Sequence, residues 1–295
     1  MVKTKEKTPK SNKKNNNTKK DLFNIGNMDD LVKEDKINAK DNQIDPLLPR
    51  HPFRMLICGA SGTGKSNLAL QILYKPLVVY DRLYVFSSMI DQPKYKFLKR
   101  HLDLLDEMVQ KECDIKQKTI MTWETELEKI ENLMDILETD FKNLVVIDDY
   151  ACQPDKKVQK IIDNLFTRIR HKNTSIMMLS QLMYRDPCSR AVRNNLSHVI
   201  LYNNYNATEV QLLSREYGSD LPRMQFKKLY NYILSEKYAF MLIDNTATDR
   251  RMRYRRNFDG LYGGPLAIYD ANYFRPKNYS VEDEEEDKTK EEDKF

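Results

Sequence analysis

Residues 56–70, LICGASGTGKSNLAL, decide the fold of this 295-residue chain. The apolar run RMLIC at 54–58 leads into a glycine-rich loop, and KSNLALQIL, which starts at residue 65, has the composition of a helix. The loop matches GxxxxGK[ST] in full, and a strand before it with a helix after it is the context in which this motif binds phosphate. The sequence therefore predicts that the loop holds a nucleoside triphosphate.

Each residue type in this loop has a physical task. Glycines let the backbone turn its N–H groups inward around phosphate oxygens, and the N-terminus of the following helix adds the positive end of its dipole. Lys65 is expected to reach the β- and γ-phosphates, and the Ser66 hydroxyl is expected to bind Mg²⁺. The predicted nucleotide-binding residues are Gly59, Ala60, Ser61, Gly62, Thr63, Gly64, Lys65 and Ser66.

Two adjacent carboxylates follow the apolar run LVVI at 144–147. Asp148, at the end of this expected buried strand, is predicted to hold Mg²⁺. Asp149 is predicted to orient or deprotonate the attacking water as a general base. A small-molecule kinase has no need of such a carboxylate, so the pair favours an ATP-driven motor. The alternative is a strand that simply ends in a polar turn.

The segment RIRHKNTSIMMLSQL at 168–182 places arginines before a strand and Gln181 after it. Ligands bind beyond the carboxyl ends of parallel strands, so Gln181 is expected near the γ-phosphate. Arg170 is expected at the opposite edge, where it serves only the nucleotide of a neighbouring subunit. Alternatively, Gln181 only ends a strand and Arg170 stabilises a helix C-terminus. The choice of trans-acting arginine stays open among Arg168, Arg170, Arg185, Arg190 and Arg193.

Short apolar runs alternate with helical patterns along the rest of the chain. Strands are expected at Arg54–Cys58, Leu83–Ser87, Leu144–Asp148, Ser175–Ser180, His198–Tyr202 and Tyr238–Asp244. Helices are expected at Lys65–Tyr74, Lys94–Glu112, Glu124–Asp140, Asp155–His171, Arg190–Asn195 and Thr208–Tyr217. This alternation predicts a doubly wound α/β fold with a mostly parallel central sheet and helices on both faces. The last strand candidate is expected to be half of a C-terminal antiparallel hairpin.

Charge divides the chain into three parts. Residues 1–45 are a lysine-rich arm with too little apolar content to fold, and 279–295 are an acidic tail, so both are expected to be disordered. Residues 46–278 are expected to form the ATPase domain. Four scattered cysteines argue against a disulfide framework or zinc site, and the lack of a long apolar run argues against a membrane span. An intracellular protein is expected.

The basic stretch RRMRYRR at 250–256 holds five arginines in seven positions and is the candidate contact for a nucleic-acid track of the motor. A DNA motor grips backbone phosphates through Lys and Arg with little reading of bases. Strand alternation places Arg251, Arg253 and Arg255 on one face, and these are the predicted DNA-binding residues. The alternative is a sheet edge protected from aggregation by charge.

Together, the phosphate loop, LVVIDDY (144–150) and SIMMLSQ (175–181) resemble the FtsK–HerA superfamily of DNA-pumping ATPases. FTRIRHKNTSIMMLSQ (166–181) and NNLSHVILYN (194–203) are similar to segments of the poxvirus-type genome-packaging ATPases of large DNA viruses. The resemblance covers roughly 50–245 of this chain.

This resemblance implies a RecA-like P-loop NTPase core, ATP and Mg²⁺ as cofactors, a homo-oligomeric ring, and ATP-driven translocation of double-stranded DNA into a capsid. It also implies a capsid component as a partner and a location in the host cytoplasm, at a viral assembly site or in association with the virion. By matching position, Asp148 would hold magnesium, Asp149 would activate water, Gln181 would be the sensor and Arg170 the trans-acting arginine. Three other functions stay open: a DNA pump or helicase in replication or segregation, a nucleotide-dependent adaptor, and a nucleoside kinase.

Overall fold

The strands form one sheet in the computed structural model, which describes residues 42–113, 121–124, 133–148, 156–185, 188–203, 206–218, 221–248 and 252–258. In the order β3-β2-β4-β5-β1-β6-β7-β8, the described part of the chain gives an eight-stranded sheet. The strands are β1 (Arg54–Cys58), β2 (Arg82–Ser87), β3 (Met121–Glu124), β4 (Asn143–Asp148), β5 (Thr174–Ser180), β6 (His198–Tyr202), β7 (Phe240–Asp244) and β8 (Tyr254–Arg256).

Strand direction changes once across this sheet. Six neighbouring strands, in the order β3-β2-β4-β5-β1-β6, pair in parallel. Strand β7 then pairs antiparallel with β6, and β8 antiparallel with β7. The mostly parallel α/β fold with a C-terminal antiparallel hairpin is thus confirmed.

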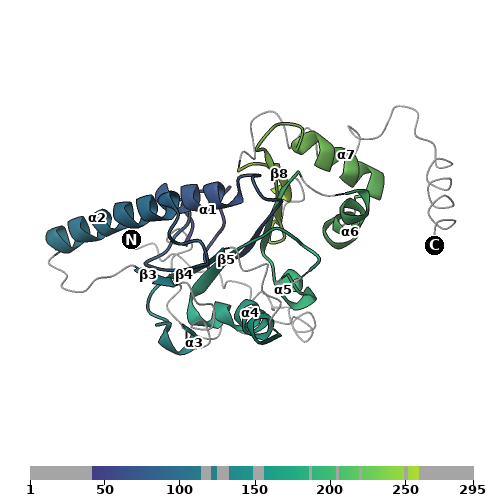
Figure 1. The fold of residues 1–295 in the computed structure, drawn as a ribbon. Coiled ribbons are helices and arrows are strands. Elements are labelled where there is room, and N and C mark those ends of the chain that lie inside the picture. The colour runs from purple at the N-terminus through teal and green to yellow at the C-terminus, as the bar shows by residue number, and fades with distance from the viewer. Residues whose placement is uncertain are drawn as a thin grey trace, which may run out of the picture. The chain divides into compact units, whose positions relative to one another are not determined.

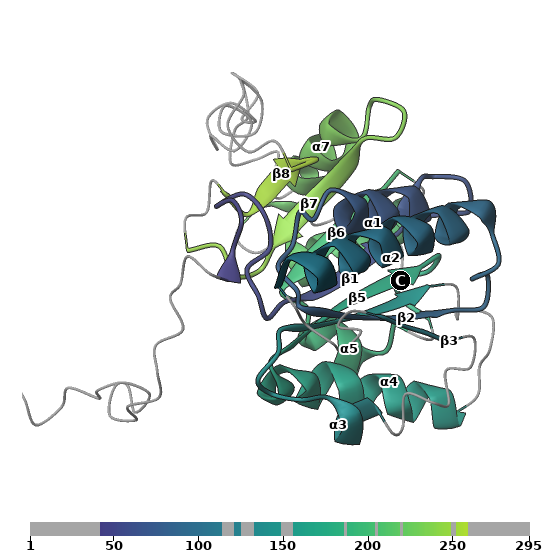
Figure 2. The same ribbon diagram turned by 90° about the vertical axis from the view of Figure 1, so that its left-hand side faces the viewer.

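Helices cover both faces of the sheet (Figures 1 and 2). On one face lie α1 and α2, and on the other lie α3, α4 and α5 (Figure 2). The helices are α1 (Lys65–Tyr74), α2 (Pro93–Cys113), α3 (Leu133–Ile136), α4 (Lys156–Arg168), α5 (Arg190–Asn194), α6 (Ala207–Tyr217) and α7 (Arg223–Ile233), with a short 3-10 helix, η5 (Ile169–Lys172).

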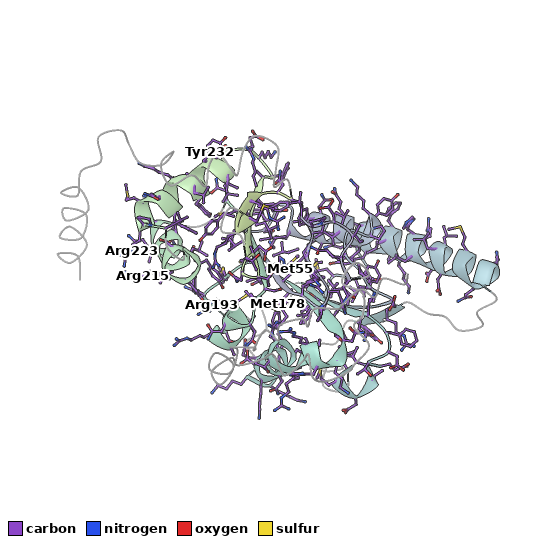
Figure 3. All side chains as sticks on the ribbon, turned by 180° about the vertical axis from the view of Figure 1, so that it is seen from behind. Met55, Met178, Arg193, Arg215, Arg223 and Tyr232 are labelled. Atoms are coloured by element: carbon purple, nitrogen blue, oxygen red, sulfur yellow. The ribbon has the colours of Figure 1, made fainter. Side chains whose placement is uncertain are left out.

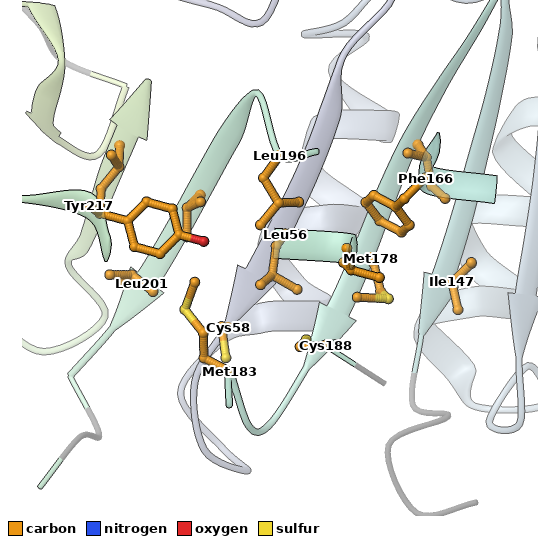
Figure 4. Packing of buried hydrophobic residues seen from close by; sticks show 14 of the residues in the cluster. Leu56, Cys58, Ile147, Phe166, Met178, Met183, Cys188, Leu196, Leu201 and Tyr217 are labelled. Atoms are coloured by element: carbon orange, nitrogen blue, oxygen red, sulfur yellow. The ribbon is translucent and has the colours of Figure 1, made fainter. Parts of the chain in front are cut away.

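Alternation along β1 supplies both layers of the core. Met55 and Ile57 pack in the cluster that includes α1 and α2, whereas Leu56 and Cys58 pack in the cluster that includes α4 to α7. All four side chains are fully buried. Figure 4 shows the second cluster, in which Cys58 and Met183 lie near the end of β1. A strand buried on both faces explains why the run before the loop is continuously apolar.

One predicted helix is wrong. In place of a helix over Glu124–Asp140, the described residues hold the end of β3 at Glu124 and the short α3 at Leu133–Ile136. Residues 125–132 lie outside the described part of the chain. Four residues suffice for β3 because it forms an edge strand, paired in register with β2. Helix α7 is not predicted from the sequence.

The described residues begin at Asn42, before the expected domain boundary at residue 46. The Leu48 amide donates to the carbonyl of Asp45 at 2.9 Å, and the His51 amide donates to the carbonyl of Asn42 at 2.8 Å. The expectations for residues 1–41 and for the acidic tail fall outside the described residues. Within the described ranges, no helix is both long enough and apolar enough to cross a membrane.

Arg255 is buried, with only 2% of its surface exposed. Its Nη1 donates to the carbonyl of Leu47 at 2.5 Å, and its Nη2 lies 3.5 Å from Asp244 Oδ2. Burial alone would raise the pKa of Asp244, but hydrogen bonds from His198 and Thr246 outweigh it and hold that pKa well below its usual value. Arg255 therefore ties the segment before β1 to the C-terminal hairpin.

This position corrects the expectation that Arg255 contacts DNA. A guanidinium buried against Leu47 and Asp244 is not available to the phosphates of a large, rigid duplex. Arg253 is partly exposed and donates to Asn245 Oδ1 at 3.2 Å. Arg251 lies outside the described residues.

We expect Arg255→Ala to lower the free energy of unfolding by about 3 kcal/mol, because it removes a buried side chain together with its hydrogen bond to the Leu47 carbonyl and its ion pair with Asp244. The matched variant is Arg253→Ala, because Arg253 lies two residues before Arg255 and is partly exposed. This variant is expected to lower the free energy of unfolding by less than about 1 kcal/mol. Urea unfolding followed by circular dichroism measures both. Equal losses from the two variants would contradict the structural role of Arg255.

Candidate nucleotide-binding site

The loop between β1 and α1 has the backbone that a phosphate cradle requires. Gly62 has φ +78° and Gly64 has φ +106°, left-handed values that favour glycine. Gly59 has no room for a side chain, because a Cβ there would lie 2.7 Å from the Cβ of Tyr202. Its amide donates to the carbonyl of Ser180 at 3.2 Å, which joins the loop to the end of β5.

The Lys65 side chain folds back over this loop. Its Nζ donates to the carbonyl oxygens of Gly59 at 2.6 Å and Ala60 at 2.7 Å. The Thr63 hydroxyl donates to the same Ala60 carbonyl at 2.8 Å. These bonds hold the cationic group beside the turn, at the N-terminus of the ten-residue helix α1.

A cavity of about 330 Å³ opens beside the loop. It extends over the carboxyl ends of β5, β4 and β2, as expected for a ligand site in a parallel sheet. The cavity is lined by Ser61, Gly62, Gly64, Lys65, Ser66, Asn67, Met89, Gln92, Lys94, Asp148 and Gln181. Three predicted parts of the site therefore meet in one place: the loop with Ser66, Asp148 and Gln181.

Asp148 is held by a residue that the sequence analysis does not identify. The carboxylate is 5% exposed, and its Oδ2 accepts a hydrogen bond from the Tyr95 hydroxyl. Tyr95 is itself 3% exposed and lies in the first turn of α2. The contact fixes the orientation of Asp148 toward the cavity wall.

The donors present fit a magnesium-bound triphosphate. The loop offers the backbone N–H groups at the N-terminus of α1 and the Lys65 ammonium for phosphate oxygens. A hydroxyl (Ser66) and a carboxylate (Asp148) line the same cavity, and these hard oxygen ligands suit Mg²⁺.

One other predicted residue, Arg170, does not lie at the cavity. Arg170 is exposed on η5, before β5, whereas Gln181 follows β5 at its far end. The seven residues of β5 separate the two by a distance on the order of 20 Å. Asp149 lies outside the described residues.

The other candidates for the trans-acting arginine differ in their surroundings. Arg193 is partly buried, with its Nε 2.9 Å from Glu216 Oε1 and its Nη1 donating to the carbonyl of Cys188 at 2.6 Å. It also lies over the ring of Tyr184. Arg193 thus connects α5 to α6 within one chain, while the side chains of Arg168, Arg185 and Arg190 are exposed.

No local motif in the sequence marks four further residues at the site: Met89, Gln92, Lys94 and Tyr95. They lie after β2 or in the first turn of α2, and reach the site because β2 pairs with β4. Only the strand order brings them next to Asp148.

Fold and site together define a P-loop ATPase. A mostly parallel sheet places the phosphate loop after β1, with a carboxylate at the end of β4 and a glutamine at the end of β5, around one cavity.

The chain belongs to the poxvirus A32 protein family, whose family model matches residues 41–253. This confirms the resemblance to poxvirus-type packaging ATPases, and the chain is a viral genome-packaging ATPase of that family.

Several known proteins are similar to this chain. Uncharacterized protein 075L of Invertebrate iridescent virus 6 is 24% identical over 200 residues, covering 66% of this chain and 72% of that protein. The DNA-packaging ATPase B204 of Sulfolobus turreted icosahedral virus has 16% identity and a TM-score of 0.48, covering 70% of this chain and 97% of that chain. VirB4 of Thermoanaerobacter pseudethanolicus has 12% identity and a TM-score of 0.44, covering 69% and 88% respectively.

Proposed function

We propose that this ATPase hydrolyses magnesium-bound ATP to move double-stranded DNA into a viral capsid, working as a homo-oligomeric ring. The observation that carries the proposal is the single cavity shared by the phosphate loop, Asp148 and Gln181. The membership of the chain in the poxvirus A32 family supports the DNA and capsid as partners. The site of virion assembly in the infected cell is the corresponding location.

Loop residues Gly59 to Ser66 would hold the triphosphate, with Lys65 leaving the Gly59 and Ala60 carbonyls to contact phosphate oxygens. Ser66 and Asp148 would hold the magnesium ion, which neutralises charge on the phosphates when bound. Asp149 follows Asp148 directly in the sequence, and we assign it the general base that takes a proton from the attacking water.

Gln181 is assigned to water positioning and to sensing the γ-phosphate. It lines the cavity together with Asp148, and its amide offers both a donor and an acceptor. The link to β5 gives this side chain a fixed base, because the carbonyl of Ser180 is bonded to the Gly59 amide of the loop.

Arg170 is proposed as the residue that stabilises transition-state charge at a neighbouring subunit. Its guanidinium is exposed at the edge of the sheet opposite the phosphate loop, so it is free to face another copy of the chain. An arginine supplied in trans is a common device of P-loop enzymes. In a ring, the side of one subunit that carries Arg170 would lie near the nucleotide site of the next subunit.

For DNA, Arg251 and Arg253 remain the proposed contacts within the fold, and Arg255 is excluded by its burial. Exposed arginines also occur elsewhere: Arg215 near the end of α6 and Arg223 at the start of α7 lie on the face seen in Figure 3. Contacts of this kind neutralise phosphates and make binding strongly salt-dependent.

We expect Asp149→Asn to lower the rate of ATP hydrolysis at least ~100-fold while ATP still binds, because the amide cannot accept the proton from water. Wild-type hydrolysis is expected to rise several-fold with double-stranded DNA. Steady-state phosphate release, with and without DNA, measures both effects. Hydrolysis by the wild type that ignores DNA would contradict a DNA motor, and strand displacement would favour a helicase.

Tyr95→Phe is expected to raise the Mg²⁺ concentration needed for half-maximal hydrolysis about 10-fold, because Asp148 loses the hydroxyl that orients it. ATP binding in the presence of EDTA is expected to stay unchanged, which a general loss of structure would not allow. Tyr74→Phe is the matched control, since the Tyr74 ring packs on Phe97 and His101 of the same helix α2. An unchanged Mg²⁺ dependence in Tyr95→Phe would contradict this positioning role.

Mixing experiments test Arg170. Arg170→Ala and Lys65→Ala are each expected to be inactive alone, and an equimolar mixture to recover roughly a quarter of wild-type hydrolysis, because half the sites are intact and half of those have an intact neighbour. Lys65→Ala mixed with Gln181→Ala is the control and should recover nothing, since both residues act within one subunit. Activity of Arg170→Ala alone, or a mixture without recovery, would contradict the assignment.

A further inference from the structure

Aromatic side chains line the phosphate loop on the side away from Asp148. Tyr202 ends β6, and a Cβ at Gly64 would lie 3.7 Å from the Tyr202 hydroxyl and 3.7 Å from Cδ1 of Tyr238. The Tyr202 ring also lies 5.8 Å from that of Phe240, with Phe258 a further 5.3 Å beyond it. The loop is therefore flanked by rings on its β6–β7 side.

Tyr238 differs from the other rings because it is exposed. Its side chain keeps 60% of its surface accessible, whereas Tyr202 and Phe240 are buried. The Lys237 ammonium lies 4.9 Å from the ring centre and still leaves most of the ring open. A large aromatic surface thus stands open beside the phosphate loop.

The backbone of Tyr238 is held in an unusual conformation. Among the described residues with positive φ that are not glycine, Asn173 and Asn257 are of a type that tolerates the left-handed region, but Tyr238, at φ +66°, is not. The turn is fixed by a hydrogen bond from the Ala239 amide to the carbonyl of Glu236 and by pairing of Phe240 with Tyr202. Strain in an exposed aromatic residue next to a ligand site points to a binding role.

The strand order separates the two ends of a bound nucleotide. Gln181 and Asp148 lie over β5 and β4, on one side of β1, and this side would take the γ-phosphate and the metal ion. Strands β6 and β7 lie on the other side of β1. The nucleoside end of the triphosphate must leave the loop in that direction, where Tyr238 lies.

We propose that Tyr238 is the platform on which the base of the bound nucleoside triphosphate stacks. The inference rests on the proposed binding of ATP at the phosphate loop and adds the subsite for its base. Stacking on a ring tolerates any base, because every base has a π-face, and it favours the larger purines.

The test compares ATP with inorganic tripolyphosphate, which has the phosphates but no base. We expect Tyr238→Ala to raise the Kd for ATP about 10-fold and to leave the Kd for tripolyphosphate unchanged. Tyr238→Phe should bind ATP as the wild type does. Alanine and phenylalanine carry the same left-handed backbone cost as tyrosine, so the variants differ in the ring alone. Isothermal titration with Mg²⁺ measures each Kd.

Tyr232→Ala is the matched control, since Tyr232 is a 48% exposed tyrosine on α7 (Figure 3), and it should leave both Kd values unchanged. An unchanged Kd for ATP in Tyr238→Ala would overturn the base subsite, and so would an equal loss for both ligands, which would place the effect on the phosphates. A wild-type protein that binds neither ligand would instead contradict the proposed function itself.

Discussion

Parallel pairing of β1 with β5 on one side and β6 on the other fixes where the parts of the site lie. In register, Cys58 pairs with Ser180 and with Leu201, so the loop that leaves β1 emerges between Gln181 and Tyr202. The bond from the Gly59 amide to the Ser180 carbonyl extends this pairing by one residue into the loop. Met55, Leu56 and Ile57 are all fully buried, so β1 is covered on both faces at the centre of the sheet, between β5 and β6.

Local signals in the sequence suffice for the parts of the fold that depend on consecutive residues. The expected limits of β1, α1 and β6 agree with the structure residue for residue, since glycines, a helix start and apolar runs act within a few positions. The expected limits of helices and strands are wrong where the conformation depends on pairing with a strand far away in the sequence. Strand β3 is only four residues long and owes its conformation to β2, while the charged stretch after it has the periodicity of a helix.

The same distinction applies to the site. The loop and Asp148 follow from motifs, but Tyr95 reaches Asp148 across 53 positions of sequence, and Tyr238 reaches the loop only through the pairing of β7 with β6. Alternation correctly relates neighbouring residues of β8 to opposite faces, yet it does not say which face is covered. Arg255 turns out to be buried because residues ahead of β1 return to it, through the Leu47 carbonyl.

Polar side chains have different roles at the two ends of the parallel strands. At the amino ends, these side chains form hydrogen bonds within the fold. His51 is hydrogen-bonded to Asn173 and Ser175, and Arg54 donates to the Phe166 carbonyl and to Asn195. Burial, and then the charge of Arg170, lower the pKa of Arg54. At the carboxyl ends, backbone and side chains instead surround an open cavity. Arg170 lies at the amino ends of the strands, so it is too far from the phosphate loop of its own chain to act there. Any part that Arg170 takes in hydrolysis therefore requires a second copy of the protein.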